Sequence, residues 1–100
     1  MIATLYEGLV ALAPSLGARV GHAAATLDAS GPGAALALLD TLASDPAATT
    51  YQPYWAVRAE VLHRAGRGAE AGDAYERAVG LSEDEATREF LRARAARPVG

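Results

Sequence analysis

The stretch WAVRAEVLHRAGRGAEAGDAYERAVGLSE, residues 55–83, decides the fold, because it places apolar side chains at helical spacing on both sides of a glycine turn. Before the turn at Gly66, three residues recur at i, i+4 and i+7: Trp55, Ala59 and Leu62. After it, small and aromatic residues form a second stripe: Ala71, Ala74, Tyr75, Ala78 and Val79. Residues three or four apart share one face of a helix. The sequence therefore predicts two antiparallel helices, over about 52–65 and 68–80.

The C-terminal helix, 83–97, has a clear start signal. Ser82 followed three residues later by Glu85 is typical of a capping box, in which each side chain bonds the backbone N–H of the other residue. Three residues at helical spacing are expected to face the core: Ala86, Phe90 and Ala93. Pro98 ends the helix, since proline cannot continue it.

The same helical spacing covers the rest of the chain. It predicts helices over about 2–13, 15–29 and 33–43, and Pro14 ends the first of them. The polar residues 44–50 are expected to form a loop. No stretch alternates apolar and polar residues as a strand does. The sequence therefore predicts an all-α fold of six short antiparallel helices.

An internal repeat accompanies this spacing. Four residues in the first half have counterparts 36 positions later: Ser30, Ala35, Leu39 and Leu42 correspond to Gly66, Ala71, Tyr75 and Ala78. The stretch 55–83 resembles the tetratricopeptide repeat, a helix pair of about 34 residues with small and aromatic residues at fixed places. The resemblance implies one domain that forms a right-handed superhelix. Its units are a half repeat at 2–14, a degenerate repeat at 16–47, a repeat at 52–82 and the C-terminal helix.

The repeat resemblance also assigns structural positions. Small residues there let paired helices approach closely, and large ones fill the space beside them. Twelve residues occupy such packing positions: Tyr6, Ala35, Leu39, Leu42, Trp55, Ala59, Leu62, Gly66, Ala71, Tyr75, Ala78 and Phe90. Two positions depart from the pattern, because Arg58 stands where an apolar residue is usual and Glu83 where proline is common.

Charge and composition narrow the class of function. The chain has nine arginines, no lysine and a net charge of −3, so we expect no direct binding of nucleic acid. The absence of cysteine excludes disulfides and thiolate metal sites. No apolar run is long enough to span a membrane, so we expect a cytoplasmic chain that does not bind membranes. The arginines within 88–97 are interpreted as cations near a helix C-terminus.

No residue pattern indicates catalysis. His22 and His63 lie on different repeats and do not supply the four ligands that structural zinc requires. The serines lie at caps and turns without the local partners of a nucleophile: Ser15, Ser30, Ser44 and Ser82. We therefore predict no enzyme, no catalytic or metal-ligating residue, and no cofactor.

The chain as a whole resembles the C-terminal domain of extracytoplasmic-function sigma factors from high-GC bacteria. The resemblance covers about residues 2–95 and is carried by LVALAPS (9–15), GPGAALALLD (31–40), YQPYWAVRA (51–59) and the block 64–78. It implies a regulatory, protein-binding extension that modulates transcription initiation and contains no promoter-reading element itself. The implied partners are the factor's own sigma domains, RNA polymerase or a regulator.

The candidate protein-binding face is the concave side of the helix at 52–65. The repeat resemblance places five residues there: Tyr54, Ala56, Glu60, His63 and Arg64. Helical repeats bind peptides on such concave surfaces. Two alternatives stay open: a generic adaptor that binds a peptide of an unrelated partner, or a wall that is only solvated. The half repeat at 2–14 lacks a paired helix, which allows a homodimer through that segment.

Overall fold

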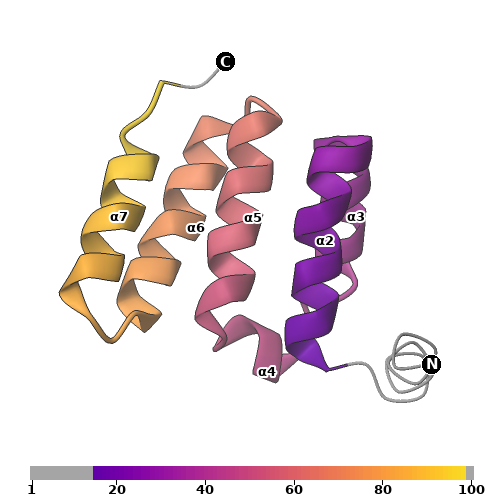
Figure 1. Ribbon diagram of the computed structural model, residues 1–100, viewed down its shortest axis with the longest axis horizontal. Helices are drawn as coiled ribbons and strands as arrows, with labels where there is room; N and C mark the ends of the chain where they lie inside the picture. Colours follow the sequence, from indigo (N-terminus) through magenta and orange to yellow (C-terminus); the bar gives the residue numbers. More distant parts are fainter. Residues whose placement is uncertain (1–14, 99–100) are drawn as a thin grey trace, which may run out of the picture.

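The protein is built of helices joined by short turns (Figure 1). A computed structural model describes residues 15–98; the predicted helix at 2–13, with Tyr6 and the half repeat at 2–14, lies outside them. All regular structure in the described residues is helical: α2 (Leu16–Ser30), α3 (Pro32–Asp40), α4 (Pro46–Thr49), α5 (Gln52–Arg64), α6 (Gly68–Leu81) and α7 (Glu85–Ala95). This confirms the predicted all-α class, whereas the right-handed superhelix stays a prediction. No helix within 15–98 is long and apolar enough to cross a membrane.

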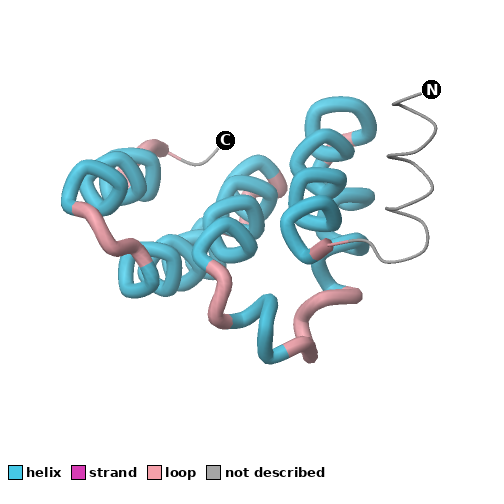
Figure 2. The backbone as a smooth tube through the Cα atoms, turned by 60° about the horizontal axis from the view of Figure 1, so that its bottom comes forward, coloured by secondary structure: helices cyan, strands magenta, loops and turns pink. Residues whose placement is uncertain are grey.

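The long helices alternate in direction along the chain. α2 packs against α3, α5 against α6, and α7 against α6. In Figure 1, α2, α5 and α7 run in one direction, and α3 and α6 run in the opposite direction. Figure 2 shows α7 and α5 in one layer, with α6 beneath and between them. The C-terminal ends of α2, α5 and α7 therefore lie at one end of the molecule, and their N-terminal ends lie at the other.

Small side chains let α5 and α6 approach closely. Every alanine at their predicted contact positions has almost no exposed surface: Ala59, Ala71, Ala74 and Ala78. The turn between the helices needs a left-handed residue, and Gly66 supplies it with φ of 78°. Arg67 then donates its backbone N–H to the Leu62 carbonyl at 2.9 Å, which closes the end of α5. The stripes in residues 55–83 thus form the interface that they predict.

Two apolar clusters make up the core, and Trp55 lies where they meet. The first joins α2, α3, α4 and α5, with Leu39 and Tyr54 at its centre; the second joins α5, α6 and α7 around Leu62 and Tyr75. Trp55 is partly buried and packs against both clusters. Its indole N–H donates to the Thr49 carbonyl at 2.9 Å.

Arg58, which departs from the repeat pattern, has a polar partner. Its side chain is only 20% exposed, and its Nη1 lies 3.0 Å from Asp40 Oδ1 at the end of α3. The pair links α5 to α3 beside the first cluster. A charged residue is therefore accepted at a position that is usually apolar, because the facing helix supplies a carboxylate.

The expected loop at 44–50 contains one turn of helix. Asp45 accepts the backbone N–H of Ala47 at 2.9 Å, and Pro46 occupies the first turn of α4. Both features favour the start of a helix. Ala48 is fully buried in the first cluster, so this turn also closes the core. A single turn is too short to show a helical period, which is why the sequence predicted a loop.

The predicted capping box at Ser82 and Glu85 is wrong. Asp84 caps α7, because its carboxylate accepts the backbone N–H of Thr87 at 2.9 Å and also the Thr87 hydroxyl. These bonds lower the pKa of the Asp84 carboxyl below its usual range. Ser82 belongs instead to the end of α6, where its hydroxyl donates to the Ala78 carbonyl at 2.7 Å.

The packing face predicted for α7 is also wrong. Phe90 is 58% exposed, and Ala86 and Ala93 are exposed as well, whereas Leu91 is buried at 3%. Neighbouring residues lie about 100° apart around a helix. The face of α7 that packs against the core can therefore contain Leu91 or the stripe that includes Phe90, but not both. The packing position assigned to Phe90 therefore belongs to Leu91. The apolar stripe that the sequence placed in the core lies at the surface.

Asp84→Ala is expected to lower the free energy of unfolding by about 1 kcal/mol, because it removes the α7 cap. For a domain of this size, that corresponds to a melting temperature lower by about 4–8 °C. Asp84→Asn serves as the control, since an amide oxygen also caps a helix. Thermal unfolding followed by circular dichroism measures both variants. An Asp84→Ala variant as stable as the parent would contradict this assignment of the cap.

Leu91→Ala and Phe90→Ala are expected to differ sharply in stability. Truncation of the buried leucine costs about 2–3 kcal/mol, because it removes apolar contacts and leaves a cavity. Truncation of the exposed phenylalanine costs about 0.5 kcal/mol or less, as for most surface substitutions. Urea denaturation of the two variants measures the difference. Equal losses, or a larger loss for Phe90→Ala, would show that α7 packs through the face that the sequence predicted.

Candidate functional site

The Glu60 carboxylate on α5 gathers hydrogen bonds from two neighbouring helices and from the turn that follows α7. Its Oε1 accepts Tyr75 OH at 3.1 Å, Arg94 Nη2 at 2.9 Å and Arg97 Nη2 at 2.6 Å. Its Oε2 accepts Arg64 Nε, one turn further along α5, at 3.0 Å. The Glu60 side chain is 16% exposed, so these bonds form in a partly desolvated position. One carboxylate therefore connects α5, α6 and the C-terminal end of α7.

These donors keep Glu60 ionised. Burial would raise the pKa of the Glu60 carboxyl, but the hydrogen bonds from Arg94, Arg97, Arg64 and Tyr75 outweigh it and lower the pKa to about 2. Hydrogen bonds and nearby opposite charges both favour the charged form of a carboxyl. Glu60 is therefore negatively charged throughout the physiological range.

The cluster carries a net positive charge. Arg64 Nη1 also lies 2.9 Å from Asp28 Oδ1 near the end of α2, so three guanidinium groups face two carboxylates. Arg97 Nε donates to the Arg94 carbonyl at 3.0 Å, which holds the chain as it leaves α7. The cluster lies toward the C-terminal ends of α2, α5 and α7 (Figure 1). Helix dipoles favour cations there.

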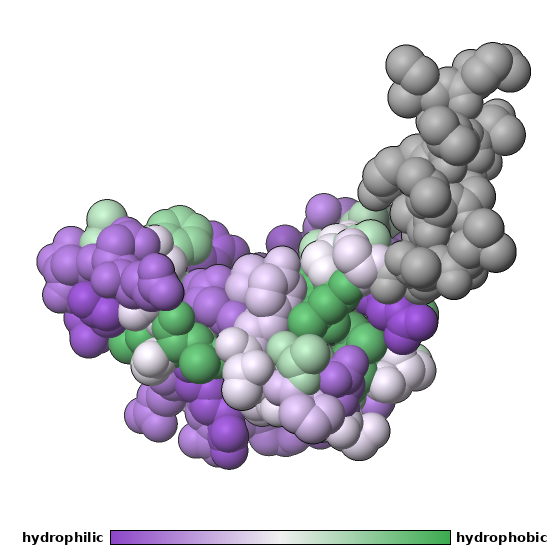
Figure 3. Space-filling model, turned by 90° about the horizontal axis from the view of Figure 1, so that it is seen from below, coloured by the Kyte–Doolittle hydropathy of each residue, from purple (hydrophilic) through white to green (hydrophobic). Residues whose placement is uncertain are grey.

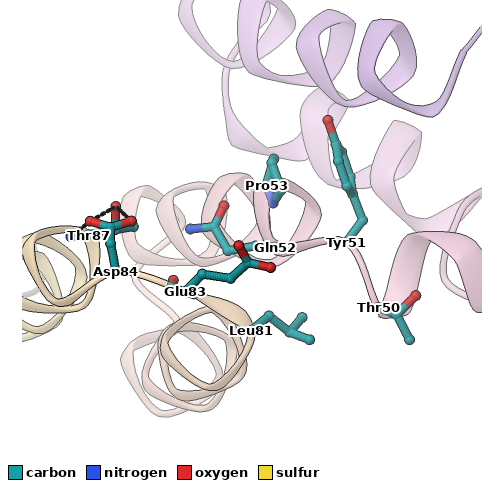
Figure 4. Close-up of a pocket in the computed structure, with 9 residues that line it drawn as sticks. Thr50, Tyr51, Gln52, Pro53, Leu81, Glu83, Asp84 and Thr87 are labelled. Carbon is teal, nitrogen blue, oxygen red and sulfur yellow. Dashed lines mark hydrogen bonds between the residues drawn. The ribbon is translucent and has the colours of Figure 1, made fainter.

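A cavity of about 350 Å³ lies near the N-terminal ends of α5 and α7 (Figure 4). Thr50, Tyr51, Gln52 and Pro53 line one side of it. The end of α6 and the α6–α7 turn line the other side: Leu81, Ser82, Glu83, Asp84 and Thr87. In Figure 4, Glu83 lies between Gln52 and Leu81. This end of the space between α5 and α7 therefore carries acidic residues.

The arginine cluster and the cavity lie toward opposite ends of the surface between α5 and α7. Pro53 at the cavity and Glu60 in the cluster are seven residues apart, so they lie on the same side of α5. Phe90 forms part of the α7 wall, and the Arg94 guanidinium carbon lies 5.5 Å from the centre of its ring. Figure 3, seen from the cavity end, shows a hollow between the part formed by α7 on the left and the centre of the molecule. We call this feature the α5–α7 groove.

The five residues of the predicted binding face do not share one surface in the structure. Glu60 and Arg64 belong to the arginine cluster, and Ala56 and His63 are partly buried on α5. Tyr54 does not belong to an exposed face, because it is 1% exposed in the first core cluster. Tyr54 lies about 100–120° around α5 from Pro53 and Glu60, so it faces the first core cluster instead.

Sequence reasoning missed three residues of the groove: Phe90, Arg94 and Arg97. Phe90 was assigned to the core, and the arginines were interpreted as cations that complement the dipole of their own helix. Their spacing of three residues was a usable signal, since Arg94 and Arg97 share one side of the chain end. The sequence pattern does not show that Glu60 lies opposite these arginines, because this depends on how α7 packs against α6.

A second cavity, of about 440 Å³, lies between α6 and α7 and shares no residue with the groove cavity. It is lined by Gly72, Asp73, Tyr75, Glu76, Val79, Arg92 and Ala95. Within residues 15–98, no three histidine or acidic side chains are placed to hold a metal ion. No family model, curated protein or solved structure matches the chain significantly.

Glu60→Gln is expected to destabilise the protein by about 1–2 kcal/mol at pH 7, because it weakens bonds to arginines that solvent partly screens. The Glu60 pKa is about 2 in the folded protein, against an ordinary value of 4.5. The stabilisation is therefore complete above about pH 4.5 and is lost as the pH falls toward 2.

Urea denaturation of both proteins at pH 7, 4.5 and 2.5 measures this dependence. The difference between parent and Glu60→Gln should shrink between pH 4.5 and 2.5. Glu76→Gln, at an exposed position on α6, is the matched control and should differ little from the parent at each pH. A difference between parent and Glu60→Gln that does not change with pH would contradict the role of the ionised carboxylate.

Proposed function

We propose that the chain is a protein-binding regulatory domain of an extracytoplasmic-function sigma factor, and that the α5–α7 groove is its binding surface. The observation that carries this proposal is the exposed combination of Phe90 with Arg64, Arg94 and Arg97 along one groove. Aromatic residues and arginine are enriched where proteins bind other proteins. The resemblance of residues 2–95 to the C-terminal domain of these factors supplies the biological context.

The chemistry of the groove supports binding over catalysis. A general acid or base works best with a pKa near the working pH, whereas the pKa of Glu60 is about 2. The hydrogen bonds of Glu60 go to side chains that hold the helices together. Its role in the proposal is to position the arginines, which remain 34–45% exposed and reach the groove surface.

In the proposed mechanism, the groove binds a segment of the sigma domains, of RNA polymerase or of a regulator. The direction of the helices agrees with a tetratricopeptide-like array, in which α2, α5 and α7 are the first helices of successive pairs and line the inner side. Occupation of the groove changes how the sigma domains are held, and promoter activity changes with it. A generic adaptor is the second candidate, favoured by the arginine cluster because guanidinium groups bind the carboxylates of a peptide well.

The test uses the sigma factor of which this chain is proposed to be the C-terminal part. Deletion of the chain and the double variant Phe90→Ala/Arg97→Ala should each change transcription from the factor's own promoter by about fivefold or more, as expected when interface anchors worth about 1–2 kcal/mol are removed. Promoter binding by the sigma domains should be unchanged. Glu76→Ala, outside the groove, is the control.

Two results would overturn the proposal. One is a deletion mutant that transcribes like the parent. The other is the absence of a helix-turn-helix sequence in the coding region upstream of Met1. That result would favour the generic adaptor. In vitro transcription with purified polymerase, together with a promoter-binding assay, separates an effect on initiation from an effect on DNA binding.

A further inference from the structure

The two ends of the α5–α7 groove carry opposite charge. Glu83 and Asp84 lie at the cavity end, and Arg94 and Arg97 lie at the cluster end. Asp84, which caps α7, and Arg94 are ten positions apart, which corresponds to about 15 Å along the helix axis. The overall charge of −3 hides this separation, because it averages over the whole chain.

The acidic end has a carboxylate available for a partner. Asp84 uses both of its oxygens to bind Thr87. Glu83 lines the cavity and is exposed, and no hydrogen bond or ion pair joins it to another residue within 15–98. A lysine or arginine of a partner would therefore meet Glu83 without displacing an existing contact in the described part of the chain.

The basic end has donors available for a partner. Towards the described residues, Arg94 donates only through Nη2, and Arg97 through Nε and Nη2. A guanidinium group has five N–H donors, so each of these two partly exposed arginines has donors that make no hydrogen bond within 15–98. With three guanidinium groups against two carboxylates, this end attracts an acidic side chain.

The middle of the groove has an apolar contact surface. The exposed Phe90 ring stands on the α7 side, and Pro53 and Ala56 are partly exposed on the α5 side. A central apolar side chain of a partner would bury the Phe90 ring, and the charged ends of the groove would fix where the partner lies. Complementary charge sets position and specificity more than it adds affinity.

We propose that the α5–α7 groove binds a short protein segment that is basic at one end, apolar in the middle and acidic at the other end. The opposite charges are separated by about 15 Å, which corresponds to ten residues of helix or to about five residues of extended chain. The basic end lies against Glu83, and the acidic end lies against Arg94 and Arg97. This inference rests on the proposed role of the groove as a binding surface and specifies the chemistry of its partner.

Three fluorescent 12-residue peptides test the inference on the 100-residue chain. They share an apolar centre and have blocked termini; one has two lysines at one end and two glutamates at the other, one has glutamates at both ends, and one has lysines at both ends. Fluorescence polarisation at low salt should show the bipolar peptide binding about fivefold more tightly than either of the others, as expected for about 1 kcal/mol of charge interaction. At 0.5 M salt this preference should nearly disappear.

Two charge-reversal variants make the test specific. Glu83→Lys removes the net negative charge of the acidic end, so the bipolar peptide should lose its preference and the peptide with glutamates at both ends should bind at least as tightly. Glu76→Lys makes the same change of charge at the second cavity and should leave the order of the three peptides unchanged. Circular dichroism of both variants checks that they remain folded.

Three results would overturn the inference. These are equal binding of the doubly acidic and bipolar peptides to the parent protein, an unchanged order of affinities in Glu83→Lys, or no binding of any of the three peptides. None of these three results tests the proposed function, which is measured separately by transcription from the factor's promoter. A deletion mutant without effect on transcription, in turn, would overturn the sigma-factor role even if the bipolar peptide binds.

Discussion

The hydrogen bonds of the Glu60 carboxylate are the interactions on which the packing of α7 depends, and with it the shape of the proposed binding surface. α7 buries a single large apolar side chain, Leu91, so apolar packing alone holds it weakly. Arg94 and Arg97 bind Glu60, and Arg88 donates to the Ser82 carbonyl at 2.6 Å. These polar contacts set how α7 stands against α5 and α6. At the basic end of the α5–α7 groove, the positions of Arg94 and Arg97 therefore follow from this one carboxylate.

The two core clusters differ in composition. This difference explains why polar contacts matter for the position of α7. The first cluster contains Tyr54, Val61 and three leucines, and it is closed by α4. The second is lined largely by alanines, with Leu62, Tyr75 and Leu91 as its large members. Alanines bring α5 and α6 close together but bury little area per residue. Stability at the α7 end therefore depends more on hydrogen bonds and ion pairs, and their arginines remain partly exposed at the surface.

Much of the fold, and part of the site, was predictable from local patterns. The stripe Ala35, Leu39 and Leu42 is buried as predicted, because each helical period is long enough to define a face. The same holds for the predicted contact residues of α5 and α6: Ala59, Leu62, Ala71, Ala74 and Ala78. The repeat resemblance placed Glu60 and Arg64 together on one face of their helix, and both belong to the arginine cluster. Prediction failed where two local signals competed, as at Ser82 and Asp84, and where the apolar pattern of α7 offered two faces.

The sequence by itself determined the all-α class, the glycine turn at Gly66 and the interface between α5 and α6, because these depend on residues close together in the chain. Only the tertiary structure decided that Leu91 faces inward, that Phe90 faces outward and that Arg94 and Arg97 meet Glu60. The bonds from Arg94 and Arg97 to Glu60 join residues that are 34 and 37 positions apart in the chain. Periodicity assigns a residue to a side of its own helix, but it does not say which helix stands opposite.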